Sequence, residues 1–377
     1  DISLAMYELK NVLEEQRPGN ESGMVGLLHK IGIRKADRMV ENEKSQASLT
    51  QRESKGFSQA GRFEIRTDLA VEKKEDFTEK ARELSGVSMR EWYQKESRVK
   101  LTKVEILNEE GSRAMGKAVG TYITLEAGQM AFKDEDYHRQ VSAELAGQIR
   151  DLAGKTGKEV RHLLVVGLGN HLVTPDSLGP QVVGNLNVTR HLDMEYGSGF
   201  LKDRGMIAIS GMIPGVMAQT GMETAEIIRG IVSQTKPDLM IAIDALAARS
   251  VRRLGTTIQL TDTGIHPGSG VGNHRRALTE ETLGIPVLAV GVPTVVGAAA
   301  IVQDTVQAMI RVLKNDSSTR GAGDYLESLE AEEQYRLIQE LLEPEFGPFY
   351  VTPPDIDETV KAVSYTISEA IHQAFLP

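Results

Sequence analysis

Two short apolar runs, each leading to an aspartate, constrain the fold of this chain more than any other feature. The first run covers residues 163–170 and is followed by Asp176, and the second covers 239–243 and leads directly into Asp244. Both runs are rich in β-branched residues and apolar on both faces, which is typical of buried strands in a parallel sheet. Catalytic groups gather beyond the carboxyl ends of such strands. We therefore expect Asp176 and Asp244 to meet at one edge of a sheet, where two carboxylates can share a proton and activate water.

Each aspartate also has a purely structural interpretation. Aspartate is a preferred N-cap residue. Asp176 precedes a predicted helix, and Asp244 would cap a helix that starts at Ala245. The catalytic and the capping interpretations both stay open at this point, and the coincidence of two aspartates at two strand ends favours the catalytic one.

Composition narrows the class of protein. The chain has 377 residues, of which 40% are hydrophobic, and a net charge of -10; the length is enough for one large domain, or for one domain with appendages. It has no basic stripe with interleaved aromatic residues, so we expect no direct binding of nucleic acid. The absence of cysteine excludes disulfides, thiolate catalysis and cysteine-ligated metals, and agrees with a cytoplasmic location. No apolar stretch is long enough to span a membrane, and no signal peptide is visible.

The pattern along the chain predicts an arm and one folded domain. Residues 1–61 are polar enough, especially over 41–61, to predict a flexible arm with one short helix over 7–16. Residues 62–377 form the domain: an α/β core over 155–315 with three layers, α/β/α, and a mostly parallel sheet, followed by a C-terminal helical part over 324–377. The expected strands are 99–107, 118–125, 163–167, 239–243, 257–261 and 286–292, and the expected helices are 134–153, 177–191, 220–232, 298–313, 328–342 and 355–375.

Two glycine-rich segments follow predicted strands. Gly167-x-Gly169 begins like a dinucleotide loop, but position 172 is Leu172, so the third glycine of that motif is missing. A tight turn that brings Asn170 close to the strand ends is the better interpretation. The second segment contains Gly268, Gly270 and Gly272 and lacks the Lys-Ser/Thr of a P-loop. Its N–H groups are candidates to support a substrate strand or an oxyanion.

The remaining candidates are weaker. Asp262-Thr263-Gly264 is the tripeptide of pepsin-like proteases, but the chain carries one copy in an alternating β/α pattern, so we expect a turn there with at most a supporting role for Asp262. The loops after strands contain His171 and His266. His266 is the candidate to join Asp176 and Asp244 in holding a metal ion.

Several uninterrupted stretches resemble the germination proteases of spore-forming bacteria. Two of the longest read Ala-Ile-Asp-Ala-Leu-Ala-Ala-Arg-Ser at 242–250 and Asp-Thr-Gly-Ile-His-Pro-Gly-Ser-Gly-Val-Gly-Asn at 262–273. The others lie at 66–72, 167–180, 188–192, 213–217, 236–238 and 291–296. The similarity extends over 62–377 and weakens between 313 and 329, and the long segment before residue 62 departs from the family's short pre-sequence.

The resemblance implies an endopeptidase of the spore core that degrades the small acid-soluble proteins coating spore DNA. It further implies a zymogen, a homo-oligomer that is a tetramer, and a core similar to the hydrogenase maturation proteases. The two aspartates implicated in the family fall on Asp176 and Asp244, with protease class assigned as either atypical aspartic or metallo. The residues favour an aspartate dyad without a cofactor. The alternatives are a metallopeptidase using Asp176, Asp244 and His266, and a non-enzymatic metal-binding module of the same fold.

The resemblance also points to a processing site. The family's substrates are cut in the pattern Thr/Ser-Glu, then Phe/Ile-Ala-Ser-Glu, and residues 67–72, Thr-Asp-Leu-Ala-Val-Glu, resemble it. This predicts self-processing between Asp68 and Leu69 in a segment that is accessible to a second molecule. The alternative is that Leu69 and Val71 simply begin a strand.

Overall fold

The computed structural model describes residues 68–75, 86–130, 134–197, 199–265, 276–315, 338 and 349–377. Contacts divide the chain into residues 1–62 and 63–377, and all described residues belong to the second unit. The arm predicted over 1–61, most of the helix predicted over 328–342, and the loop with His266, Gly268, Gly270 and Gly272 lie outside the described residues. No helix in the described part is long and apolar enough to cross a membrane.

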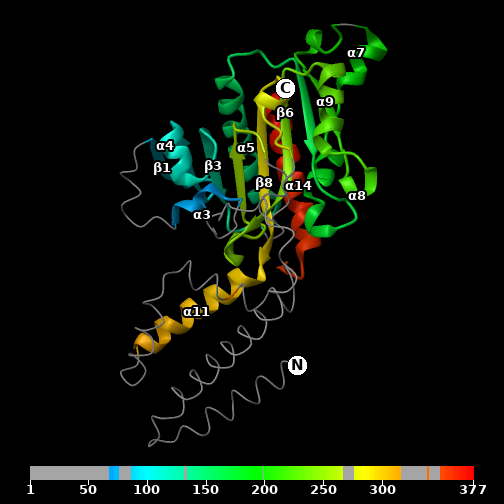
Figure 1. Cartoon of the computed structure of the whole chain (residues 1–377). Coiled ribbons are helices and arrows are strands. Elements are labelled where there is room, and N and C mark those ends of the chain that lie inside the picture. The colour runs from blue at the N-terminus through cyan, green and yellow to red at the C-terminus, as the bar shows by residue number, and fades with distance from the viewer. Residues whose placement is uncertain are drawn as a thin grey trace, which may run out of the picture. The chain divides into compact units, whose positions relative to one another are not determined.

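A nine-stranded mixed sheet forms the centre of the described unit (Figure 1). Its order is β1-β2-β3-β7-β8-β6-β4-β5, and β9 pairs with β8. The neighbours β8, β6, β4 and β5 are parallel, whereas β1, β2, β3, β7 and β9 are joined by antiparallel pairing. The strands are β1 Val87–Gln94, β2 Val99–Ile106, β3 Gly120–Glu126, β4 His162–Gly167, β5 Ala208–Met212, β6 Leu239–Ala248, β7 Thr257–Thr261, β8 Val287–Gly297 and β9 Tyr350–Val351.

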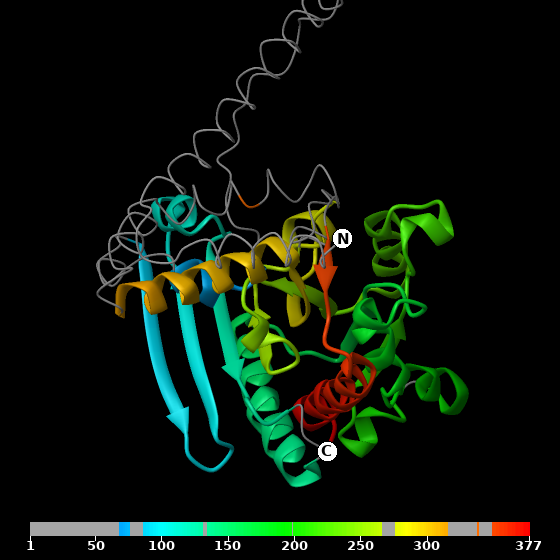
Figure 2. The ribbon, with the colours of Figure 1, turned by 90° about the horizontal axis from the view of Figure 1, so that it is seen from below.

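Helices cover both faces of the sheet, which confirms the expected α/β class with three layers. One face packs against α5 Glu135–Lys155, α6 Leu178–Gly184 and α14 Ile356–Phe375, and Figure 2 shows α5 and α14 side by side. The other face packs against α9 Thr224–Thr235 and α10 Glu280–Leu283. The other described helices are α3 Ala70–Glu75, α4 Glu109–Met115, α7 Arg190–Tyr196, α8 Met217–Thr220 and α11 Ala298–Asn315, with single turns η2 Thr174–Asp176, η3 Lys202–Arg204 and η4 Val251–Arg253.

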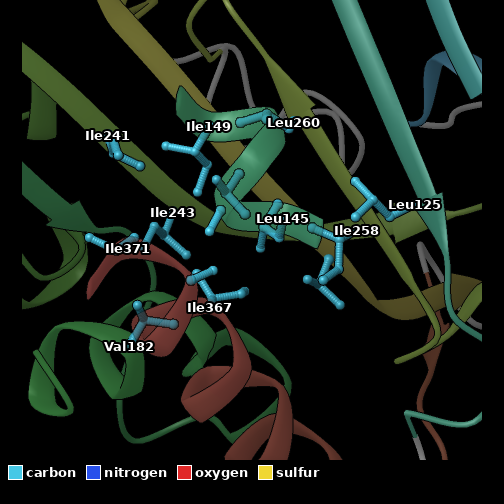
Figure 3. Packing of buried hydrophobic residues seen from close by; sticks show 14 of the residues in the cluster. Leu125, Leu145, Ile149, Val182, Ile241, Ile243, Ile258, Leu260, Ile367 and Ile371 are labelled. Atoms are coloured by element: carbon cyan, nitrogen blue, oxygen red, sulfur yellow. The ribbon is translucent and has the colours of Figure 1, made fainter. Parts of the chain in front are cut away.

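The core explains why the strands of the parallel block are apolar on both faces. In β4, Leu163 and Val165 pack toward α5, α6 and α14, whereas Leu164 and Val166 pack toward α9. Figure 3 shows the apolar cluster between the sheet and the helices α5, α6 and α14, with Ile243 facing α14. Because strand side chains alternate between faces, a strand covered on both sides needs apolar residues throughout. Burial of each such aliphatic side chain stabilises the folded state by about 1.5–3 kcal/mol relative to leaving it exposed.

The structure corrects two helices predicted from sequence. The helix expected over 177–191 is divided into α6 and α7, because Thr189 pairs with the β5 segment: its hydroxyl donates to the Ile207 carbonyl and accepts from the Ile209 N–H. The helix expected from Thr220 begins at Thr224 instead. Gly221, with φ of 70°, ends α8, so Thr220 closes one helix rather than capping the next.

One strand of the expected parallel core also differs. β7 runs antiparallel to β8. The connection from β6 to β7 spans only residues 249–256. A parallel crossover needs about a dozen residues or more, so a connection of this length cannot return β7 in the parallel direction.

Candidate active site

The two aspartates lie near the carboxyl end of β4, at a point where the neighbouring parallel strand β6 continues further. β4 ends at Gly167, which pairs with Ile243, and Asp244 is the next residue along β6. β6 continues to Ala248, so the prediction that Asp244 caps a helix at Ala245 is wrong. Asp176 closes η2 and is not the N-cap of α6, a position taken by Ser177. Both aspartates line one cavity of about 400 Å³.

A glycine turn sets the position of Asp176. Gly169 has φ of 109°, and a Cβ atom there would lie 2.0 Å from the Asp176 carbonyl oxygen, so only glycine fits. The next residue, Asn170, donates its backbone N–H to Asp176 Oδ2 at 2.8 Å. The Asn170 side chain accepts from Gln219 of α8 at 2.9 Å. These contacts confirm the tight turn expected from Gly167-x-Gly169.

Asp68, the first residue of the predicted processing site, lines the same cavity. Asp68 lines the 400 Å³ cavity with Asp176 and Asp244, and lines a second cavity of about 300 Å³ that also includes Asp244. Asp68 runs beside β6: its N–H donates to the Ala247 carbonyl at 3.2 Å, and its Oδ2 accepts from the Ala247 N–H at 3.0 Å. The chain therefore places Asp68, the residue before the predicted cleavage point, at the cavity that the two aspartates also line.

The expectation that this segment is accessible to a second molecule is wrong. Leu69 and Ala70 are fully buried, and Leu69 belongs to an apolar cluster with Leu246 and Val296. The alternative of a strand is also wrong, because α3 begins at Ala70. Burial of apolar side chains outweighs the exposure that the polar flanking sequence suggested.

A buried ionic contact anchors the far end of the segment. Glu72 is 1% exposed, and its carboxylate accepts from the backbone N–H groups of Arg249 at 2.8 Å and Ser250 at 3.1 Å. Arg253 Nε lies 3.3 Å from Glu72 Oε1, and Arg253 Nη1 lies 2.9 Å from Glu126 Oε1. Removal of one partner from such a buried group is costly, so Glu72 fixes the register of residues 68–72.

Two residues that sequence reasoning missed contact the carbonyl oxygen of Asp68. Lys117, in the turn between α4 and β3, donates from Nζ at 2.9 Å. Gln259 of β7 donates from Nε2 at 3.1 Å, while its Oε1 accepts from the Ala70 N–H at 2.6 Å. Gln259 had a usable signal, since it is a polar residue inside a fully buried strand. Lys117 had none, because its role depends on a turn far from Asp68 in sequence.

Tyr122 of β3 also lines the 300 Å³ cavity. Its hydroxyl donates to the Ala118 carbonyl at 2.9 Å, and the Lys117 ammonium lies 5.7 Å from the centre of its ring. Burial raises the pKa of this phenol, so it stays protonated at neutral pH and is not available as a base. Its part here is to support Lys117.

The structure does not bring all of the weaker candidates to the two cavities. Asp262 accepts from the Thr121 N–H at 2.7 Å and does not line either cavity, whereas Thr263 and Gly264 line the smaller one. His171 is exposed. Within the described residues, no group of three or more His, Cys, Asp or Glu side chains is arranged to hold a metal ion. His266, Gly268, Gly270 and Gly272 lie outside those residues, so their predicted roles stay predictions.

Comparison with known proteins identifies the family. Residues 64–323 match the family model of the germination protease peptidases. A germination protease of Caldanaerobacter subterraneus subsp. tengcongensis is 48% identical over 314 residues, covering 83% of this chain and 94% of the relative. Germination proteases of Clostridium tetani and Bacillus cytotoxicus are 44% and 40% identical, again covering 83% of this chain, and 96% and 94% of the relatives.

A search of solved structures gives a more distant likeness. A [NiFe] hydrogenase maturation protease, HycI from Thermococcus kodakarensis, is 15% identical and covers 59% of this chain and 98% of its own, with a TM-score of 0.28. At that TM-score the likeness adds nothing to the fold described above. The family model and the relatives each cover most of the chain, and on these grounds the protein belongs to the germination protease family, the peptidases of spore germination.

Proposed function

We propose that this protein is an endopeptidase that begins the degradation of small acid-soluble DNA-coat proteins during spore germination. It is made as a zymogen, acts in the cytoplasm of the spore as a homo-oligomer, a tetramer, and uses an aspartate dyad without a metal. The observation that carries this proposal is the shared cavity of Asp68, Asp176 and Asp244, because the residue before the predicted cleavage point and the two candidate acids line the same cavity.

In this mechanism Asp176 and Asp244 share one proton. The ionised carboxylate accepts a proton from water as the water adds to the scissile carbonyl, and the protonated one gives its proton to the leaving amine. General acid–base catalysis of this kind contributes about 10²–10⁴-fold to the rate. The N–H of Asn170 supports this role, since a hydrogen bond to Asp176 stabilises its ionised form.

Self-processing between Asp68 and Leu69 is the activating step of the proposal. Residues 68–72, which we call the docked segment, are held against the domain by the hydrogen bond of Asp68 with Ala247 and the ion pair of Glu72 with Arg253. This arrangement supports cleavage within the molecule. Cleavage separates Asp68 from the rest of the domain, and because Asp68 lines both cavities, its release opens the site to protein substrates.

The test is incubation of the purified full-length chain with a small acid-soluble spore protein, with and without strong chelator, with fragments read by mass. We expect a new N-terminus at Leu69 and fragments of the coat protein at equal rates in both samples. Loss of activity in chelator that added metal restores would move the assignment to the metal-dependent alternative with Asp176, Asp244 and His266. Absence of any cleavage would favour a non-enzymatic module of the same fold.

A further inference from the structure

We propose that Lys117 and Gln259 form the oxyanion hole for hydrolysis of the Asp68–Leu69 bond. This inference rests on the proposed self-processing and adds two catalytic residues to it. Gln259 lies on the antiparallel strand β7 and Lys117 in the turn before β3, whereas Asp244 lies on the parallel strand β6 and Asp176 in η2, after β4.

The distances suit donors that stabilise developing negative charge. Lys117 Nζ lies 2.9 Å and Gln259 Nε2 lies 3.1 Å from the Asp68 carbonyl oxygen. An oxyanion donor must lie about 2.7–3.1 Å from the position that the charged oxygen takes, and these two donors already contact the same oxygen before the reaction. One of the two donors carries a positive charge, and hydrogen bonds from a charged donor are about twice as strong as neutral ones.

The orientation of Gln259 follows from its own contacts. Its Oε1 lies 2.6 Å from the backbone nitrogen of Ala70, and a backbone N–H can only donate. The amide oxygen must therefore face Ala70, which directs the NH₂ group to Asp68. Gln259 is only 7% exposed and its Oε1 is bound by the Ala70 N–H, so its donor is held in place before the reaction.

Hydrolysis of the Asp68–Leu69 bond takes two steps, addition of water and release of the amine. Water adds to the carbonyl carbon of Asp68, and one of its protons passes to the ionised carboxylate of the Asp176–Asp244 pair. The π electrons of the carbonyl move to its oxygen, which Lys117 and Gln259 stabilise. The oxyanion then re-forms the carbonyl, the bond from carbon to the Leu69 nitrogen breaks, and the protonated carboxyl group gives its proton to that nitrogen. The products are a carboxylic acid at Asp68 and an amine at Leu69. The acid passes its proton to the amine through water to give a carboxylate and an ammonium group, and the aspartate pair keeps one proton as at the start.

The competing explanation is that Lys117 and Gln259 only dock the segment. The two roles can be measured separately. Docking protects the Ala70 amide, which donates to Gln259, from hydrogen exchange, whereas oxyanion stabilisation changes only the rate of processing. Hydrogen–deuterium exchange of the Ala70 amide in a full-length Asp176→Asn chain measures docking without cleavage. The rate of Leu69 N-terminus formation in the chain with Asp176 intact measures chemistry.

The decisive variant is Lys117→Met, made in both backgrounds. We expect processing to slow by about 10²–10³-fold, the usual effect of losing one oxyanion donor, while protection of Ala70 stays at its starting value. Lys117→Arg should recover part of the rate, because it keeps a charged donor. The matched control is Lys155→Met, since Lys155 also contacts β3, at Thr121, but does not touch Asp68. It should process at the wild-type rate.

Gln259→Glu provides a second test. The variant keeps an oxygen for the Ala70 N–H and replaces the donor to Asp68 with an acceptor, so processing should slow while the segment stays docked. Processing at the wild-type rate in Lys117→Met, or a loss of rate matched by an equal loss of Ala70 protection, overturns the oxyanion role. A wild-type chain that does not cut at Asp68–Leu69 overturns self-processing itself, and this result is visible before any variant is made.

Discussion

The parallel and antiparallel parts of the sheet contribute different groups to one site. The parallel block places two carboxylates, Asp244 within β6 and Asp176 beside the end of β4. The antiparallel block places donors: Gln259 on β7, and Lys117 in the turn that leads into β3. Residues 68–72 lie between these groups, held by contacts to β6 on one side and β7 on the other.

The difference follows from strand geometry. In the parallel block the carboxyl ends of neighbouring strands meet at one edge, so residues that follow them converge by topology. In an antiparallel block, amino and carboxyl ends of strands alternate along each edge, so the carboxyl ends do not gather. A polar side chain within such a strand reaches a site only if it lies on the face of the sheet that lines the site. The comparison predicts that substitution of the aspartates in the parallel block lowers the cleavage rate at unchanged stability. Substitutions in the docked segment should lower the free energy of unfolding and displace the Asp68–Leu69 bond.

The largest effect is expected for the aspartates. Asp176→Asn and Asp244→Asn should each reduce processing and cleavage in trans by at least about 10²-fold, with thermal stability close to wild type, because each removes one proton carrier. N-terminal sequencing and fragment masses measure the rates. Asp262→Asn is the control, since Asp262 accepts from Thr121 outside both cavities and should stay active. Wild-type turnover in either active-site variant at unchanged stability would reject the dyad.

Gly169→Ala should come next. The φ of 109° is strained for any residue with a Cβ, and the added methyl group would meet the Asp176 carbonyl oxygen, so we expect a loss of at least about 2 kcal/mol in the free energy of unfolding. Processing should fall with it because Asp176 shifts. The matched control is Gly184→Ala at the end of α6, where no atom lies within 4 Å of an added Cβ. Urea unfolding of both variants checks the pair, and equal stabilities would contradict the proposed role of the turn.

Glu72→Gln tests positioning without touching the aspartates. The variant keeps the shape of the side chain but loses the charge that meets Arg253 and two backbone N–H groups, so stability should fall by about 1–3 kcal/mol. Processing should slow because the register of Asp68 is less well fixed. Glu91→Gln, which removes an exposed pair with Lys100, is the control and should change stability by about 0.5 kcal/mol or less. Faster processing in Glu72→Gln would show that the anchor restrains the reaction.

The smallest effect concerns pH and β4. Burial lowers the pKa of His162 below its ordinary value of 6.5. Its ring nitrogens contact the Thr235 carbonyl at 3.1 Å and the Ser210 hydroxyl at 2.9 Å, an arrangement that suits the neutral ring. Below pH 6.5 the unfolded chain binds the proton more readily, so stability should be complete above that pH and decrease as the pH falls. Unfolding free energies at pH 7.5 and 5.5 should differ less in His162→Gln than in wild type, and an equal difference would exclude His162 as the source.

The sequence predicted three of the four parallel strands, β4, β6 and β8, because their apolar runs are local signals, whereas it missed β5, which is short and contains Ser210 and Gly211. The apolar runs gave β4 and β6, Gly169 gave the turn, and the rule for strand ends gave Asp176 and Asp244. Predictions that depended on helix boundaries were less successful. Thr189 looks like part of a helix until its hydroxyl is seen to pair with β5, and Gly221 ends a helix that sequence spacing had begun at Thr220.

What the sequence determined by itself is therefore the family, the α/β class and two candidate catalytic acids, because each depends on residues close together in the chain or on identity to relatives. The tertiary structure alone decided that residues 68–72 are buried, that Glu72 meets Arg253, and that Lys117 and Gln259 converge on the Asp68 carbonyl. These contacts join segments separated by 49 to 191 positions in the chain. Such pairs carry no local periodicity, and they form only when burial of the whole sheet brings the segments together.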